Sequence, residues 1–293
     1  TLQRSAKVRM TGFINFYKPS GMSSAISLVK IKKLLGKSVK CGHMGTLDPL
    51  ASGVLPVAIG KATRLFDYLL DKVKVYEAEF TFGYETDTLD LGGKIINEGG
   101  RVPEISEVKA AAERQVGKIA QIPPAYSAKN VNGKRRYELA RKGIAVELKP
   151  KTVEILSIIV SESEKVGAFN FKITCKGGTY IRSICRDIAK NLQTYATMTK
   201  LVRVKSGVFD INHSISVDEL TSENLKDHLI LPETVLDFKR AEILSEEYKD
   251  LLDGKQIDFD GENGLYVCMY NKVMAGIMLA EDKKAKMKTY IGE

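Results

Sequence analysis

A single carboxylate within a run of turn-forming residues is the first feature of this sequence that points to chemistry. Asp48 lies in residues 42–56, a stretch that contains three glycines and two prolines. Glycine loosens the backbone, and proline fixes φ and removes a hydrogen-bond donor, so the stretch is predicted to be a shaped loop. A carboxylate held on such a loop between Leu47 and Pro49 can act as a nucleophile or a general base. An Asp before a Pro is also a common turn residue, and spacing alone favours that interpretation.

The residues around Asp48 resemble the signature of a known enzyme family. Residues 42–56 read Gly-His-Met-Gly-Thr-Leu-Asp-Pro-Leu-Ala-Ser-Gly-Val-Leu-Pro. This run is similar to the signature of the TruB-type pseudouridine synthases, which isomerise the uridine at position 55 in the T-loop of tRNA. Further matching segments follow the family's order: Lys-Pro-Ser-Gly-Met-Ser-Ser at 18–24, Tyr76, Thr-Asp-Thr-Leu-Asp at 86–90, Pro-Pro-Ala-Tyr-Ser-Ala-Lys at 123–129 and Gly-Thr-Tyr-Ile-Arg-Ser at 178–183.

The resemblance implies a catalytic group of four side chains. Asp48 would be the catalytic carboxylate, and Tyr76 would stack its ring on the target base. Arg182 would form an ion pair with Asp48, and Tyr180 would hydrogen-bond or assist a proton transfer beside them. A neighbouring guanidinium favours the charged form of a desolvated acid, which gives a physical reason for an arginine to accompany this carboxylate. Whether Asp48 attacks the ribose or the base stays open.

Other residues are expected, again from the resemblance, to bind the RNA. Leu201 would form a wall of the base pocket, and His43 would occupy the space left by displaced loop bases. Lys18 and Asp90 would lie at the RNA-binding cleft. The sequence pattern alone favours core positions for Tyr76 and Leu201 and turn positions for His43 and Asp90.

The most basic part of the chain lies between residues 129 and 151, with eight basic residues against two acidic ones. This segment follows Pro123 and Pro124 and is predicted to leave the core and return near Pro150. The resemblance implies a thumb-like insertion at about residues 124–151 that closes on the RNA stem. A solvated hairpin and helix is the alternative. The residues assigned here to RNA binding are Lys129, Lys134, Arg135 and Arg136.

Charge and composition favour a nucleic-acid partner and disfavour several other classes. The net charge is +9, but residues 1–217 hold 35 basic and 19 acidic side chains, whereas residues 218–262 hold 5 basic and 14 acidic ones. The positive field of the first part suits a polyanion. The chain has four cysteines without a Cys-x-x-Cys pair and three histidines, which argues against a zinc site and fits a reducing cytoplasm. No apolar run approaches the ~20 residues that span a bilayer.

Alternating and helical patterns predict the elements that must hold these residues, and together they indicate an α+β fold with a mixed, largely antiparallel sheet. Strands are predicted at 13–17, 75–82, 153–162 and 169–175, and a hairpin at 265–270 and 273–279. Helices are predicted after Ser23 or Ser24 and after Gly178. The resemblance implies a pseudouridine-synthase catalytic domain at 10–232 and a small PUA-like β domain at 233–293. Residues 1–9 are expected to be leader or vector-derived sequence before a native start at Met10.

The expected function is therefore isomerisation of uridine in the T-arm of tRNA by a cytoplasmic monomer. The reaction involves no redox change and no net hydrolysis, so no cofactor, metal or guide RNA is expected. One alternative is a non-catalytic tRNA-binding or tRNA-folding module, which would not require Asp48, Tyr76 and Arg182 together. The other is a guide-RNA-directed relative, which shares the Asp loop. The Ala-Ser-Gly continuation at 51–53 and the basic insertion resemble the stand-alone form instead.

Overall fold

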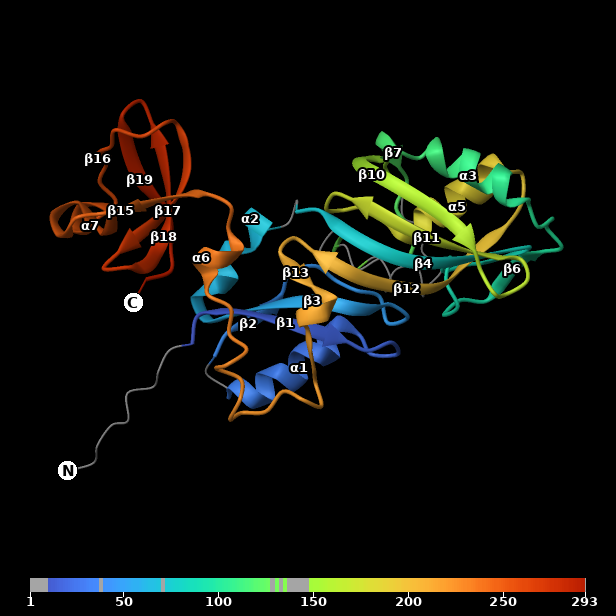
Figure 1. Cartoon of the computed structure of the whole chain (residues 1–293), viewed down its shortest axis with the longest axis horizontal. Helices are drawn as coiled ribbons and strands as arrows, with labels where there is room; N and C mark the ends of the chain where they lie inside the picture. Colours follow the sequence, from blue (N-terminus) through green and yellow to red (C-terminus); the bar gives the residue numbers. More distant parts are fainter. Residues whose placement is uncertain are drawn as a thin grey trace.

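The computed structural model describes residues 10–36, 39–69, 72–126, 130–131, 134–135 and 148–292. A larger part of the chain combines helices with a ten-stranded sheet, and a smaller part at the C-terminal end is built on a five-stranded sheet (Figure 1). This arrangement confirms the predicted α+β class and the small C-terminal β domain. Within the part that the structure describes, no helix is long and apolar enough to cross a membrane.

The large sheet is mixed and largely antiparallel, as predicted. Its central order is β14-β1-β3-β12-β4-β11-β10-β7, with β2 paired to β3 and β13 paired to β12. Only the β1–β14 and β3–β12 pairs are parallel among the strand pairs of this sheet. Its strands are β1 (Gly12–Lys18), β2 (Cys41–His43), β3 (Ser52–Ile59), β4 (Lys74–Phe82), β7 (Gly117–Gln121), β10 (Lys151–Glu162), β11 (Ala168–Cys175), β12 (Ala196–Ser206), β13 (Phe209–Asp210) and β14 (Ile215–Ser216).

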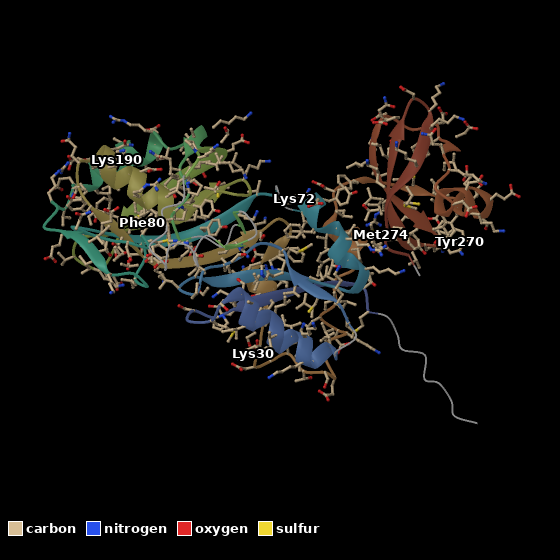
Figure 2. All side chains as sticks on the ribbon, turned by 180° about the vertical axis from the view of Figure 1, so that it is seen from behind. Lys30, Lys72, Phe80, Lys190, Tyr270 and Met274 are labelled. Atoms are coloured by element: carbon tan, nitrogen blue, oxygen red, sulfur yellow. The ribbon has the colours of Figure 1, made fainter. Side chains whose placement is uncertain are left out.

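The alternation predicted for β4 matches its burial. Tyr76, Ala78, Phe80 and Phe82 are buried along one face, and Phe80 packs on Phe171 of β11 with ring centroids 4.1 Å apart. Figure 2 shows Phe80 inside this part of the molecule. Because side chains alternate across a strand, the same pattern that builds the core also fixes the direction of Tyr76.

Helices cover both ends of the large sheet. Ser23 caps α1, since its hydroxyl accepts a hydrogen bond from the Ile26 amide at 3.2 Å. Helix α3 packs on β10 and helix α5 on β12, and the two lie together over one face of the β10–β11 region (Figure 1). The helical segments are α1 (Ser24–Leu35), η1 (Gly60–Leu65), α2 (Phe66–Leu69), α3 (Ile105–Glu113), α5 (Ile181–Asn191), η2 (Ile211–His213), α6 (Pro232–Val235) and α7 (Ser245–Leu252).

Two short hairpins lie outside the large sheet. Strands β5 (Tyr84–Thr86) and β6 (Ile95–Glu98) pair beside the end of β4, and β8 (Asn130–Val131) pairs with β9 (Lys134–Arg135). The second hairpin falls in the predicted thumb-like insertion at 124–151. Most of that insertion lies outside the residues that the structure describes, so its closing on RNA stays a prediction.

The C-terminal sheet has the order β15-β17-β18-β19-β16. The predicted hairpin is confirmed: β17 and β18 are antiparallel and turn at Asn271 and Lys272, whose φ angles of 50° and 62° fit a tight two-residue connection. The strands are β15 (Lys239–Glu242), β16 (Ile257–Asp258), β17 (Gly264–Tyr270), β18 (Val273–Glu281) and β19 (Lys284–Tyr290).

The C-terminal domain shares a hydrophobic cluster with the larger part. Phe13 and Val54 of the large sheet belong to one buried cluster with Val267, Met274 and Ile291. Polar contacts add to this junction: Arg64 donates to the Tyr290 carbonyl at 2.8 Å, and the Tyr68 and Thr289 hydroxyls lie 2.8 Å apart. Figure 2 shows Lys72 and Met274 near the junction. The boundary at residue 233 stays a prediction, because the core runs across it.

The extent of the Asp48 loop was predicted wrongly. Residues 42–56 were expected to form one loop, but residues 41–43 belong to β2 and residues 52–59 to β3. Pro56 is tolerated in β3 because it lies between residues 52–53, which pair with β12, and residues 57–59, which pair with β2. Its carbonyl still accepts a hydrogen bond from the Met44 amide at 2.8 Å. The loop is therefore residues 44–51, anchored by a strand on each side.

Candidate active site

The five residues expected to form the catalytic pocket meet around one cavity of about 330 Å³. Asp48 enters from the loop between β2 and β3, Tyr76 from β4, Tyr180 and Arg182 from the start of α5, and Leu201 from β12. The volume falls in the range of about 300–1,000 Å³ that is typical of small-molecule sites. Segments that lie far apart in the sequence therefore build a single cavity.

Hydrogen bonds from the N-terminal segment hold the Asp48 loop. The buried Ser24 hydroxyl donates to the Leu47 carbonyl at 2.8 Å and accepts from the Leu47 amide at 2.9 Å, directly before Asp48. The Gly21 amide donates to the Pro49 carbonyl at 2.8 Å, directly after it. Asp48 itself closes a turn through its carbonyl, which accepts from the Ala51 amide at 3.1 Å. The backbone on both sides of the carboxylate is thus fixed from outside the loop.

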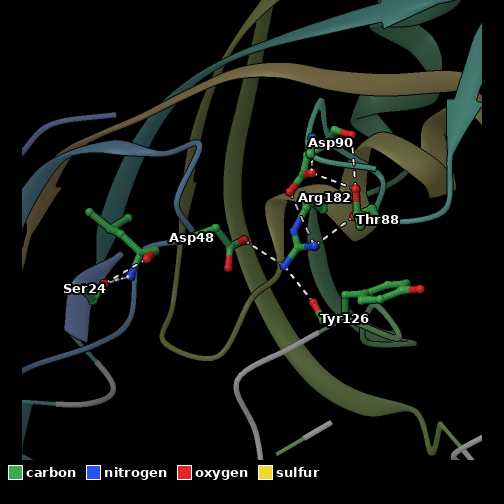
Figure 3. Close-up of polar contacts among 8 residues, drawn as sticks. Ser24, Asp48, Thr88, Asp90, Tyr126 and Arg182 are labelled. Atoms are coloured by element: carbon green, nitrogen blue, oxygen red, sulfur yellow. Dashed lines mark hydrogen bonds and ion pairs between the residues drawn. The ribbon is translucent and has the colours of Figure 1, made fainter. Parts of the chain in front are cut away.

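The Asp48 carboxylate is paired with Arg182, and Nη2 of Arg182 lies 2.8 Å from Oδ2 of Asp48. The guanidinium also donates to the Thr88 carbonyl at 2.8 Å and to the Tyr126 carbonyl at 3.0 Å. Figure 3 shows Arg182 between Asp48 on one side and the turn that carries Thr88 and Asp90 on the other. The planar fork of arginine suits this set of acceptors, which a lysine could not reach together.

Asp90 supports Arg182 from the side away from Asp48. Its Oδ1 accepts hydrogen bonds from the Thr88 hydroxyl at 2.7 Å and the Gly92 amide at 2.9 Å, and its Oδ2 lies 3.6 Å from Nη1 of Arg182. Only 10% of the Asp90 side chain is exposed. Its carboxylate therefore contacts other groups of the protein, and the predicted place of Asp90 at an RNA-binding cleft stays a prediction.

The surroundings of Asp48 act on its pKa in opposite directions. Burial raises the pKa of the Asp48 carboxyl, and the nearby negative charge of Asp90 adds to this increase. The charge and hydrogen bond of Arg182, together with the more distant Lys18, favour the carboxylate form and oppose it. Burial likewise raises the pKa of the Tyr76 phenol, so that this side chain is a neutral hydroxyl at neutral pH.

Lys18 lies behind the Asp48 loop with its side chain fully buried. Its ammonium donates to the Met22 carbonyl at 2.6 Å and the Pro19 carbonyl at 2.9 Å. Burial lowers the pKa of Lys18 to about 8, with a contribution from the positive charge of Arg203, while the negative charge of Asp48 opposes the change. The enclosed ammonium therefore affects the Asp48 carboxylate through its positive charge, which lowers the pKa of Asp48.

The remaining predicted pocket residues lie where a flat base could be held. Tyr76 and Leu201 are 7% and 6% exposed, and both line the cavity. Tyr180 is fixed by Gln121, which accepts from the Tyr180 amide at 2.9 Å and donates to its carbonyl at 3.1 Å. Side chains from three different elements therefore surround the carboxylate.

Comparison with known proteins identifies the family of the chain that forms this cavity. Residues 32–181 match the family model described as TruB family pseudouridylate synthase (N terminal domain). The chain belongs to this family. Residues 182–238 match a second model, described as tRNA pseudouridylate synthase B C-terminal domain.

Individual TruB-family relatives match over most of their length. The protein named tRNA pseudouridine synthase B of Clostridium novyi is 42% identical over 249 residues, which cover 85% of this chain and 86% of that one. The protein of the same name from Clostridium perfringens is 38% identical over 295 residues, covering 97% and 100%. A solved chain described as the structure of an H/ACA RNP bound to a substrate RNA containing 2'-deoxyuridine superposes with a TM-score of 0.70 at 24% identity, covering 96% of this chain and 85% of that one, and so shares the fold.

Not every residue predicted for this TruB-family site lines the cavity. His43 lies at the end of β2, half-buried and next to the buried Met44, which does line it. Lys129 and Arg136 lie outside the described residues, and for Lys134 and Arg135 only the backbone of β9 is described. RNA binding by these residues stays a prediction.

Sequence reasoning missed Arg203, whose side chain is 1% exposed and lines the cavity from β12. The signal was present: Arg203 follows Leu201 by two residues, and both point to the buried side of the strand. Among the described residues, no group of three or more His, Cys, Asp or Glu side chains could hold a metal ion.

Proposed function

We propose that this TruB-family protein converts uridine 55 in the T-loop of tRNA to pseudouridine, with Asp48 as the catalytic carboxylate. The relatives named tRNA pseudouridine synthase B support this substrate and reaction. The observation that carries the proposal is the Asp48–Arg182 ion pair at the edge of a cavity walled by Tyr76 and Leu201. The carboxylate has an arginine as its fixed ionic partner, and the adjacent cavity has aromatic and apolar walls that could hold a flat base.

The reaction is an isomerisation, so the pocket has to hold every fragment until the end. The bond between uracil N1 and ribose C1′ breaks, the base turns, C5 bonds to C1′, and the proton lost from C5 is balanced by one gained at N1. Asp48 would assist by adding to the ribose or to the base, and the buried walls would retain the detached uracil. Tyr180, fixed by Gln121 at the rim, would hydrogen-bond the base or assist the transfer of the C5 proton.

The target nucleotide must leave the loop stack to reach the cavity, which costs a few kcal/mol and less for a loosely held loop base. Contacts with the rest of the T-arm would offset this cost. By this proposal the basic residues Lys129, Lys134, Arg135 and Arg136 contact phosphates, and His43 fills the space that the displaced bases leave. The protein would act as a monomer in the cytoplasm, without cofactor or guide RNA.

Release of tritium from a T-arm hairpin labelled at C5 of its uridines tests this function, with the purified protein as the only macromolecule added. The expected result is release of one tritium per hairpin, and none from a matched hairpin with cytidine at the target position. Tight binding without release would indicate a non-catalytic tRNA-binding module. Release only after a second RNA is added would indicate a guide-RNA-directed enzyme.

A further inference from the structure

Arg203 is a buried arginine whose side chain contacts the backbone on both sides of Asp48 in the sequence. Its Nε donates to the Val54 carbonyl at 2.8 Å, and its Nη2 donates to the Gly45 carbonyl at 3.1 Å. Gly45 lies three residues before Asp48 and Val54 six residues after it. One guanidinium therefore joins the start of the loop that presents the carboxylate to strand β3, which follows the loop.

The backbone of Arg203 lies between β3, which follows the loop, and β4, which carries Tyr76. Arg203 pairs with Gly53 in the parallel β3–β12 contact and with Tyr76 in the antiparallel β4–β12 contact. Gly53 has φ of +103°, and a Cβ atom built on it would lie 2.3 Å from the Arg203 carbonyl oxygen. Only glycine allows this approach, so the strand that carries Arg203 fixes the end of the loop through the backbone as well.

Arg203 also carries charge into the pocket. In the part of the chain that the structure describes, no carboxylate lies within ion-pair distance of Arg203, and the hydrogen bonds given above go to neutral carbonyls. Its charge and a hydrogen bond from its side chain oppose the effect of burial on the pKa of Tyr76. Burying a cation without an ionic partner lowers the stability of the folded protein. We therefore expect Arg203 to serve the function of the site.

We propose that Arg203 is a positioning residue that fixes the Asp48 loop and the Tyr76 hydroxyl, and that it thereby sets the rate of the chemical step without contributing to RNA affinity. The proposal rests on the function proposed above. Arginine is required because one planar group must donate from two different nitrogens to one carbonyl in the loop and one in β3 while it faces the phenol. A lysine keeps the charge but offers a single nitrogen.

The test compares Arg203→Met and Arg203→Lys with wild type and with Lys205→Met, which removes one positive charge from an exposed position on the same strand. Single-turnover pseudouridine formation and T-arm affinity are measured separately. For both Arg203 variants we expect a rate loss of about 100-fold, as for a catalytic group misplaced by about 1 Å, with affinity within about threefold of wild type. Lys205→Met should retain the wild-type rate.

A second readout does not depend on activity. Fluorine on the ring of a fluorotyrosine at position 76 lowers the pKa of the phenol relative to tyrosine, and ¹⁹F NMR reports its titration. Removing the positive charge in Arg203→Met should raise the pKa of this phenol further, whereas Arg203→Lys should change it less. If Arg203→Met does not fold, the single-turnover rate and the T-arm affinity of Arg203→Lys decide the question.

The outcomes separate this proposal from the proposed function. An unchanged rate in the Arg203 variants, or a phenol titration that does not move in the variant lacking the charge, would overturn the positioning role. A rate loss explained wholly by weaker T-arm binding would also overturn it. Inactive wild-type protein would instead refute the proposed function, and the phenol titration would still test the contact between Arg203 and Tyr76.

Discussion

The Asp48 carboxylate and the Arg182 guanidinium lie 2.8 Å apart but differ sharply in exposure, with 32% of the Asp48 side chain and 6% of the Arg182 side chain accessible to solvent. The arginine is enclosed by protein acceptors, and the carboxylate lines the cavity. This asymmetry leaves the proposed catalytic carboxylate open to a substrate while its partner stays fixed. The pair is therefore suited to holding an ionised carboxylate ready without covering it.

Replacing Arg182 should lower the rate of pseudouridine formation and shift the pH dependence of that rate. Arg182→Lys loses the fork that joins Asp48 to the Thr88 and Tyr126 carbonyls, and we expect a loss of about 100-fold or more in single-turnover rate. Arg182→Met removes the charge that lowers the pKa of Asp48, so the acid limb of its pH–rate profile should move to higher pH. An unshifted acid limb in Arg182→Met would show that Asp48 ionisation does not control the reaction.

Asp90→Asn should shift the acid limb in the opposite direction. The Asp90 charge raises the pKa of Asp48, so its removal should lower that pKa and extend activity to lower pH. The maximal rate should nevertheless fall, because Arg182 loses an ionic contact on its far side. Asp87→Asn is the matched control, since this carboxylate lies in the same turn and accepts from the Lys94 amide at 2.9 Å and the Tyr126 hydroxyl at 3.4 Å. Equal pH profiles for Asp90→Asn and wild type would contradict this account.

Ser24 should affect both the stability of the protein and the position of the Asp48 loop. Ser24→Ala removes two hydrogen bonds from Leu47 in a buried setting, and we expect unfolding free energy to fall by about 1–3 kcal/mol. The turnover rate should also fall, because the backbone next to Asp48 loses its tether. Ser27→Ala removes a buried hydroxyl of the same helix that bonds only the Ser23 carbonyl, and it should affect stability alone. Equal turnover in the two variants would argue against the tether.

Lys18 should make stability depend on pH between neutral and alkaline conditions. Its pKa is about 8 in the folded protein against 10.5 for an unperturbed lysine. Between these values the unfolded chain binds the additional proton, so the free energy of unfolding rises with pH. Relative to Lys18→Met, wild type should gain up to about 3 kcal/mol from pH 8 to pH 10.5 in denaturant titrations. A constant difference across this range would show that the lysine is not desolvated.

The sequence was informative about elements and motifs and less so about contacts. The alternation of β4 predicted the direction of Tyr76, because a period of two leaves only two choices of face. The Asp48 loop was predicted too long, because glycine and proline content cannot show that β2, β1 and β12 provide β3 with partners around Pro56. Arg203 was missed for a similar reason, since its hydrogen bonds reach backbone carbonyls that are about 150 residues away in the chain.

The role of Asp90 shows the same limit. Its position in a Thr-Asp-Thr-Leu-Asp turn indicates a turn residue, and the resemblance indicated the RNA cleft. The contact with Arg182 depends on helix α5 lying against that turn, and no local pattern encodes it. Motifs thus identified five side chains that line the cavity but not Arg203, and the contacts among these residues required the three-dimensional arrangement.

In the proposed function Asp48 carries out the chemistry and the rest of the protein presents RNA to it. The most direct measurement compares wild type with Asp48→Asn on one T-arm hairpin, recording affinity and pseudouridine yield in the same samples. Asparagine keeps the shape of the side chain and removes its negative charge. We expect affinity within about threefold of wild type and no detectable yield. Undiminished yield from Asp48→Asn would contradict the account.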